Sequence, residues 1–339
     1  MKKILVIQTA FIGDVVLSTA LIESLHQYSP QAEIDILVRK GNESLFVNHP
    51  FLHEVLVWNK QERKYIHWLK ILQRIRSNQY DIVLNVQRYA ATGLWTILSG
   101  SKMTIGFDKN PFSFFFDHSI LHHESVNGLH EIHKNHALLF PLGDLPLCKP
   151  ALYPTLQDVE NVKTFQQRPY ICIAPASVWF TKQFPVHKWI EFVNEIPFQG
   201  DIFIIGGPAD SALGDKIILG TLGASGQSKR ILNLAGKLSF LSSAALQQKA
   251  VLNYVNDSAP MHFASALNAP VAAIYCSTIP SFGYGPLSDR SFIIEAPIAL
   301  ACRPCGVHGK KHCPLGHFQC AEKIEKQQLY TPLLEMTQH

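Results

Sequence analysis

The sequence lacks three features that often assign a protein to a class directly. It has no apolar run near the roughly 20 residues that cross a membrane, and the apolar run over 4–7 ends at Gln8, too short for the core of a signal peptide. It has no G-x-G-x-x-G dinucleotide fingerprint, because the loop over 9–14 carries one glycine. It also lacks a large net charge: 30 Lys and Arg against 26 Asp and Glu leave +4, which gives no reason to expect a nucleic-acid partner. We therefore expect a soluble, cytoplasmic protein.

The chain does have the length and composition of a packed globular protein. Its 339 residues are 47% hydrophobic and 17% charged, which predicts two domains of roughly 150 residues each. Apolar strand patterns alternate with helical patterns, and this alternation is typical of parallel sheets covered by helices. The strands are predicted at 4–7, 33–38, 55–58, 81–86 and 103–107, and after a boundary over 143–154 at 170–174, 201–205, 231–234, 251–255 and 271–275.

This pattern predicts two Rossmann-like, doubly wound α/β domains, 1–150 and 151–339, that face an interdomain cleft. Ligands of such folds bind outside the carboxyl ends of the strands. The loops to inspect are therefore 9–14, 175–185 and 256–262. In the first loop, Asp14 follows Gly13 and opens a helix; it is either an N-cap or a carboxylate that accepts a proton from an attacking hydroxyl.

The third loop reads N-D-S-A-P-M-H and lies between a strand and a helix. Asp257 or Ser258 suits an N-cap, and Pro260 suits the first helical turn because its missing N–H costs nothing there. His262 lies one turn after Ser258 on the same face. The stretch is either an anion site at a helix N-terminus or only a capped helix with a hydrogen-bonded histidine.

The second loop carries Lys182, which could reach a phosphate or simply lie at the surface. Ser177 and Thr181 could add hydroxyl donors. In the C-terminal part, the segment 302–320 spaces its cysteines as C-x2-C-x7-C-x6-C with three histidines between them. These thiols could bind structural zinc tetrahedrally, or they are reduced thiols packed in a loop. The cysteines are Cys302, Cys305, Cys313 and Cys320.

In order and spacing, the motifs resemble those of glycosyltransferase family 9, the ADP-heptose:lipopolysaccharide heptosyltransferases. They are K-I-L-V-I-Q-T-A-F-I-G-D-V, T-K-Q-F-P, I-I-G-G-P-A-D, N-L-A-G-K and N-D-S-A-P-M-H-F-A-S-A-L-N-A-P-V. The resemblance implies a GT-B fold with an N-terminal acceptor domain and a C-terminal nucleotide-sugar domain. It also implies inverting transfer of heptose from ADP-heptose to a hydroxyl of the lipopolysaccharide inner core, without a catalytic metal. The C-x-P-C and C-P-x-G-H elements are similar to those of heptosyltransferases of the second type.

By this resemblance, Asp14 matches the general base and Lys182 the lysine that contacts the donor phosphates. Asp257, Ser258 and His262 match the D-S-G-x-x-H donor motif, in which this chain has Ala259 instead of glycine. Lysine and a helix N-terminus can stabilise the departing ADP in place of magnesium. The added methyl leaves the donor sugar open, since alanine does not take a positive φ as cheaply as glycine.

A basic run over 60–76 holds six Lys or Arg and one acid. It is either a solvated helix face or a contact for the acidic lipid A-core acceptor or the inner-membrane surface. We expect the enzyme at the cytoplasmic face of that membrane, with no cofactor required for catalysis. The alternatives are a GT-B enzyme for another nucleotide sugar and a non-catalytic module that binds a nucleotide or glycolipid.

Overall fold

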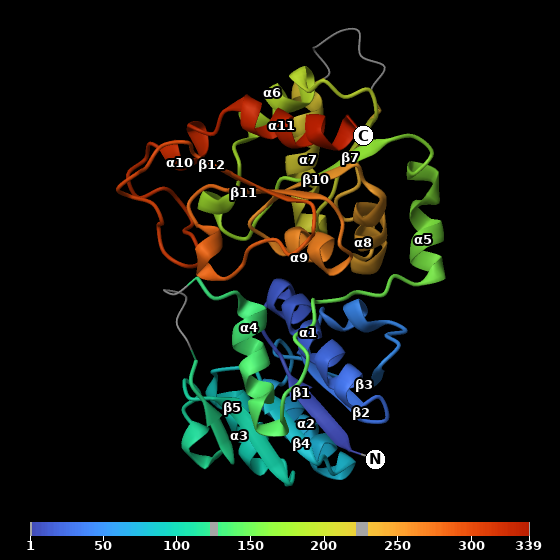
Figure 1. Cartoon of the computed structure of the whole chain (residues 1–339), viewed down its shortest axis with the longest axis vertical. Helices are drawn as coiled ribbons and strands as arrows, with labels where there is room; N and C mark the ends of the chain where they lie inside the picture. The colour runs from blue at the N-terminus through green and yellow to red at the C-terminus, as the bar shows by residue number, and fades with distance from the viewer. Residues whose placement is uncertain (1, 123–127, 222–229, 339) are drawn as a thin grey trace. The chain divides into compact units, whose positions relative to one another are not determined.

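The computed structural model describes residues 2–122, 128–221 and 230–338. The chain divides into two compact units, Met1–Tyr153 and Pro154–His339, here called unit 1 and unit 2. Each is described separately below (Figure 1). Within the described ranges, no helix is long and apolar enough to cross a membrane.

Unit 1 is built on a six-stranded parallel sheet in the order β3-β2-β1-β4-β5-β6. Val6 of the central strand lies opposite Ile36 on one side and Leu84 on the other. Strand β1 is buried along nearly its whole length, as expected for a parallel strand covered on both faces. The strands are β1 (Lys3–Ile7), β2 (Glu33–Arg39), β3 (Leu52–Trp58), β4 (Ile82–Asn85), β5 (Met103–Phe107) and β6 (His118–Ile120).

Helices α1, α2 and α3 connect successive strands of this sheet, and α4 follows its last strand. Helix α1 buries Val15 to Leu17 and Ala20 to Ile22, and α2 buries Ile71 and Ile75. The helices within the described residues of unit 1 are α1 (Ile12–Tyr28), α2 (Lys64–Asn78), α3 (Ala90–Leu98) and α4 (Glu131–His136).

Unit 2 repeats the same topology. Its parallel sheet has the order β12-β11-β10-β7-β8-β9, which is the order of unit 1 read from the other edge. The strands are β7 (Tyr170–Ala174), β8 (Asp201–Ile204), β9 (Ile231–Asn233), β10 (Leu252–Asn256), β11 (Val271–Tyr275) and β12 (Ser291–Glu295). The helices are α5 (Leu156–Val162), α6 (Val186–Glu195), α7 (Ser211–Thr221), α8 (Phe240–Lys249), α9 (Ala259–Ala266), α10 (Gln319–Glu322) and α11 (Lys326–Thr337).

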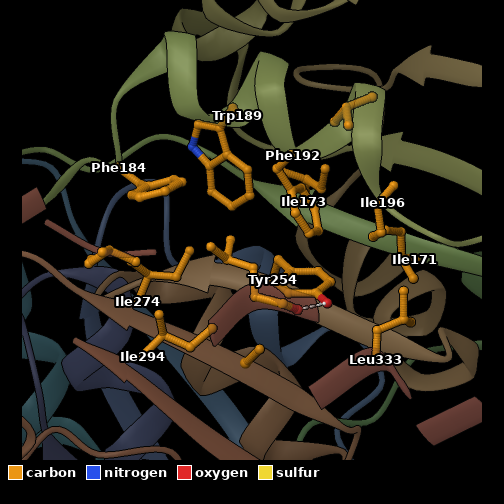
Figure 2. Packing of buried hydrophobic residues seen from close by; sticks show 14 of the residues in the cluster. Ile171, Ile173, Phe184, Trp189, Phe192, Ile196, Tyr254, Ile274, Ile294 and Leu333 are labelled. Carbon is orange, nitrogen blue, oxygen red and sulfur yellow. Dashed lines mark hydrogen bonds between the residues drawn. The ribbon is translucent and has the colours of Figure 1, made fainter. Parts of the chain in front are cut away.

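Alternate residues of β10 serve the two cores of unit 2. Tyr254 packs with Trp189 and Phe192 on one face of the sheet, while Val255 joins the cluster on the other face. Figure 2 shows the first cluster, in which the Tyr254 ring lies 4.7 Å from the Phe192 ring, centroid to centroid. The Tyr254 hydroxyl donates to the carbonyl of Leu329 at 2.6 Å, so the buried phenol has a partner and α11 is held to the sheet.

The predicted α/β alternation is confirmed, and the strand order locates the ligand-binding edge in each unit. In both sheets the order reverses beside the first strand, between β1 and β4 in unit 1 and between β7 and β10 in unit 2. Ligands of doubly wound sheets bind outside the carboxyl ends of the strands at this point. The loops after β1, β7 and β10 are the three that the sequence indicated.

Candidate functional site

The first candidate site lies after β1, where α1 begins. The N-cap of α1 is Phe11, which makes no side-chain cap hydrogen bond, and Asp14 is the third residue of the helix. Asp14 is therefore not the N-cap that was one of its two interpretations. Its carboxylate lies in the first turn beside Gly13, where the positive end of the helix dipole stabilises the ionised form.

Basic side chains surround this turn. The Arg39 guanidinium stacks 4.7 Å from the centre of the Phe11 ring. Burial lowers the pKa of Arg39, and the Asp14 carboxylate opposes that shift. The Lys60 ammonium donates to the carbonyl of Thr9 at 3.3 Å, and burial, with help from Arg39, lowers its pKa. Asp14 thus lies in a cationic environment suited to an anionic ligand.

Buried polar side chains shape the same edge of the sheet. The Gln87 side-chain amide donates to the side-chain oxygen of Gln8, which also accepts from the backbone N–H of Ala10 at 3.2 Å. The Asn42 side chain donates to the carbonyl of Ala10 at 3.2 Å. Residues from the ends of β1 and β4 and from the turn after β2 therefore hold the loop in place. The sequence reading missed them because glutamine and asparagine carry no spacing signal.

The second candidate site lies in unit 2, after β7 and β10. Asn256, at the end of β10, accepts from the N–H of Phe184 at 3.0 Å and donates to the carbonyl of Pro175 at 2.7 Å. One buried amide therefore ties both ends of the loop 175–184 to β10. This arrangement satisfies two backbone groups that would otherwise be buried without partners.

Asp257 is the centre of this second site. Its Oδ2 lies 2.7 Å from the Lys182 Nζ and accepts from the Thr278 hydroxyl at 2.6 Å. The Lys182 and Asp257 side chains are 15% and 8% exposed, so the pair is largely desolvated. The predicted association of Lys182 with the D-S-x-x-x-H turn is present, and Thr278 is a partner that the sequence reading did not identify.

The turn at the start of α9 offers fewer backbone donors than a regular helix N-terminus. Ser258 is the N-cap, but its hydroxyl donates back to the carbonyl of Asn256 at 3.3 Å and does not cap the helix. The N–H of Asp257 donates to Ile274, that of Met261 donates to Ser258, and a proline follows at position 260. Within the described residues this leaves the N–H groups of 258 and 259 for an anion.

The other residues predicted around this turn have different environments. Ala259 is the first residue of α9 and is helical, so its methyl requires no left-handed backbone. His262 is 5% exposed, and its ring lies 6.3 Å from that of Tyr284. Thr181 is 1% exposed and its Oγ1 accepts from the Ser277 hydroxyl at 2.9 Å. The expected role of Thr181 as a donor to a ligand is therefore not supported, because its hydroxyl is buried. Ser177 is partly exposed.

The cysteine-rich segment packs against the Lys182 loop. The Lys310 N–H donates to the Thr181 Oγ1 at 2.8 Å. Gly309 has φ +77°, and a Cβ there would lie 3.1 Å from the Lys182 Cγ. Arg303 fastens the start of the segment to the end of β11, with bonds of 2.7 Å to the carbonyls of both Cys276 and Thr278. The cysteine-rich segment is therefore fixed in place along one side of the loop that carries Lys182.

The cysteines themselves are free thiols. The Cys302 Sγ lies 4.0 Å from the His317 Nε2, and burial together with the neighbouring thiols raises the pKa of Cys320 to about 11. Among residues 2–122, 128–221 and 230–338, no three His, Cys, Asp or Glu side chains are arranged to hold a metal ion. Structural zinc at this segment stays a prediction.

Comparison with known proteins agrees with this geometry. Residues 68–316 match the family model described as glycosyltransferase family 9 (heptosyltransferase). The chain is 26% identical over 317 residues to lipopolysaccharide heptosyltransferase 2 of Escherichia coli K12, covering 86% of this chain and 88% of that protein. It is 24% identical to an Escherichia coli lipopolysaccharide heptosyltransferase 3, covering 79% of this chain and 82% of that protein.

Solved structures show the same fold. The structure of Escherichia coli ADP-heptose lipopolysaccharide heptosyltransferase II aligns with a TM-score of 0.80 at 22% identity, covering 99% of this chain and 98% of that one. A family 9 glycosyl transferase from Veillonella parvula aligns with a TM-score of 0.81 at 19% identity, covering 98% of both chains. The fold is thus the predicted GT-B architecture of two Rossmann-like domains. Since the family model spans well over half of its length, the chain belongs to glycosyltransferase family 9 and is a glycosyltransferase.

Proposed function

We propose that this enzyme transfers heptose from ADP-heptose to a hydroxyl of the lipopolysaccharide inner core, at the cytoplasmic face of the inner membrane. The names of the relatives support heptose and lipopolysaccharide, and the name of the similar solved structure, an ADP-heptose lipopolysaccharide heptosyltransferase, supports the donor. Unit 1 supplies the acceptor side and unit 2 the donor side. The observation that carries the proposal is the Lys182 ammonium, held 2.7 Å from the Asp257 carboxylate beside the start of α9.

On the donor side, the Lys182 ammonium and the N–H groups of Ser258 and Ala259 contact the diphosphate. As the bond between the anomeric carbon and the β-phosphate oxygen breaks, the electron pair leaves with ADP and negative charge grows on that phosphate. A cation and a helix N-terminus stabilise this charge most when it is fully developed, so no catalytic metal is required.

On the acceptor side, Asp14 takes the proton of the attacking hydroxyl while the new bond to the anomeric carbon forms. Attack from the face opposite the leaving ADP inverts the configuration. Arg39 and Lys60 hold the anionic groups of the acceptor near this carboxylate. Asp14 must be ionised before the reaction to accept this proton.

The test measures ADP release from ADP-heptose with a lipid A-core acceptor. We expect Asp14→Asn to abolish transfer while ADP affinity stays within about twofold of the unchanged enzyme, because the amide cannot accept the proton. The matched control is Glu43→Gln, which also removes a carboxylate from the first turn of a helical segment in unit 1 and should leave transfer intact. Full transfer in the Asp14 variant would exclude this residue as the base.

Two other functions are distinguished by the same experiment. A non-catalytic nucleotide or glycolipid module would bind ADP but release none from ADP-heptose in the presence of acceptor. An enzyme for a different nucleotide sugar would release its nucleotide only in a wider donor screen. Ala259 keeps this second alternative open, since its methyl stands at the first residue of α9, beside the N–H groups that meet the phosphate.

A further inference from the structure

Helix α2 exposes apolar side chains on its outer face. Its inner face is fixed by Trp68, whose indole N–H donates to the carbonyl of Ala91 at 2.9 Å, and by the buried Ile71 and Ile75. The Trp68 ring also stacks on Trp95 at 5.6 Å. Because these positions lie on one side of the helix, residues one turn apart on the other side face solvent.

On an ordinary surface helix the solvent-facing positions are polar, but here they are apolar. Tyr65 is 79% exposed, Ile66 is 50% exposed and Leu69 is 54% exposed. The three side chains occupy neighbouring positions on the first two turns, at spacings of i, i+1 and i+4. A contiguous exposed patch of large apolar side chains is typical of a surface that contacts another molecule or a membrane.

The patch is bordered by cations. Arg63 and Lys70 flank it along the chain, and the Lys64 ammonium lies 5.8 Å from the centre of the Tyr65 ring. In the described part of the chain, neither Arg63 nor Lys70 forms an ion pair with a carboxylate. The one acid of the run, Glu62, accepts a hydrogen bond from Asn59 at 3.2 Å. The surface therefore combines an apolar centre with uncompensated positive charge.

Of the partners that fit a basic surface, an anionic bilayer matches both properties. A sugar acceptor would pair with the cations but would leave the apolar side chains in water. A lipid interface accepts tyrosine and aliphatic side chains at the depth of the head groups, while lysine and arginine contact the phosphates. We propose that the N-cap and first two turns of α2, residues 63–70, dock this protein on an anionic lipid bilayer.

In this arrangement Tyr65, Ile66 and Leu69 enter the head-group region and Arg63, Lys64 and Lys70 bind lipid phosphate. The inference refines the membrane contact of the proposed function by naming the surface that makes it. It is tested by lipid binding alone, without donor or acceptor. Failure of heptosyl transfer would therefore leave it standing, and failure of lipid binding would leave the proposed chemistry standing.

The experiment is flotation of the full chain with vesicles of phosphatidylcholine alone or mixed with phosphatidylglycerol. The apolar variant is Tyr65→Ser, Ile66→Ser and Leu69→Ser, and the charge variant is Arg63→Gln and Lys70→Gln. The control variant, Leu156→Ser and Leu219→Ser, removes two exposed leucines of unit 2. Circular dichroism melting curves and ADP binding confirm that each variant is folded.

We expect the unchanged chain to bind the anionic vesicles and to bind the neutral ones at least tenfold more weakly. The charge variant should lose about 25-fold on anionic vesicles, at about fivefold for each cation, and little on neutral ones. The apolar variant should lose at least tenfold on both, and the control should match the unchanged chain. Equal binding to both vesicle types, or unchanged binding by the apolar variant, would overturn the proposal. A dimer of the unchanged chain that the apolar variant converts to a monomer, with no change in lipid binding, would instead assign the surface to a second copy.

Discussion

Replacing Lys182 with methionine separates the two tasks assigned to its ammonium. In the structure this ammonium pairs with the Asp257 carboxylate, and in the proposed donor complex it contacts phosphate. Breaking one side of a buried ion pair typically costs about 3–5 kcal/mol of unfolding free energy. Because water reaches the 15% exposed lysine and Thr278 keeps its bond to the carboxylate, we expect a loss at or below the lower end, about 2–3 kcal/mol.

The same variant should bind ADP more weakly but bind adenosine almost unchanged. A hydrogen bond to a charged group contributes about 1.5–3 kcal/mol, so the dissociation constant for ADP should rise about 10- to 150-fold. Adenosine carries no phosphate, and its dissociation constant should stay within about twofold. Calorimetric titration with the two ligands measures this difference directly, with Lys216→Met as the control for loss of an exposed cation in unit 2.

The double variant Lys182→Met with Asp257→Asn tests whether the loss of stability and the loss of ADP affinity have separate causes. Removing both charges leaves no buried carboxylate without its cation, so the unfolding free energy should recover most of the loss while ADP affinity stays low. Urea denaturation followed in the presence and absence of ADP measures both quantities. Equal losses of ADP and adenosine affinity in the single variant would mean that Lys182 does not contact phosphate. Wild-type ADP affinity in the double variant would have the same meaning.

Three further predictions follow from other contacts. Burial lowers the pKa of His49 to about 4, below the value near 6.5 of the unfolded chain. The unfolding free energy should therefore fall by up to about 3 kcal/mol as pH drops from 6.5 to 4. In His49→Phe the midpoint of urea denaturation should depend much less on pH across that window. Thr278→Val should weaken ADP binding through misplacement of Asp257 while Thr278→Ser restores it, and equal affinity in both variants would show that the 2.6 Å bond is dispensable. If the four cysteines of 302–320 bind zinc, metal analysis should find about one equivalent of zinc per chain, and Cys313→Ser should lose it. Protein purified without metal whose melting temperature does not change when zinc is added would exclude a structural zinc site.

The alternation of strands and helices could be predicted because central parallel strands are buried on both faces. All five residues of β7 are buried, as are all five of β11, and such strands are seen in a sequence as continuous apolar runs. The edge strands β6 and β12 were not predicted. In β6 no residue is fully buried, and in β12 only Ile294 is. With one side open, an edge strand needs few apolar residues, so its pattern resembles a loop.

The candidate site was only partly predictable, for a related reason. Asp14, Lys182 and Asp257 stand in motifs, so their chemistry could be anticipated from neighbouring residues. Thr278 and Arg303 stand in no motif, and they matter because the folded chain brings them to Asp257 and to the end of β11. Hydrogen bonds across 20 or more residues leave no periodic signal in a sequence.

By itself the sequence determined the fold class, the family and the three loops at the strand ends, because local apolar periodicity and short motifs are encoded by adjacent residues. Only the tertiary structure decided how those residues are used. It pairs Lys182 with Asp257, buries the hydroxyl of Thr181, turns the Ser258 hydroxyl away from the helix that it precedes, and packs the cysteine-rich segment against the Lys182 loop. Except for the Ser258 hydrogen bond, which joins residues two apart, these outcomes depend on distances between segments far apart in the chain. Those distances are set by the packing of helices on a twisted sheet and not by the spacing of residues along the chain.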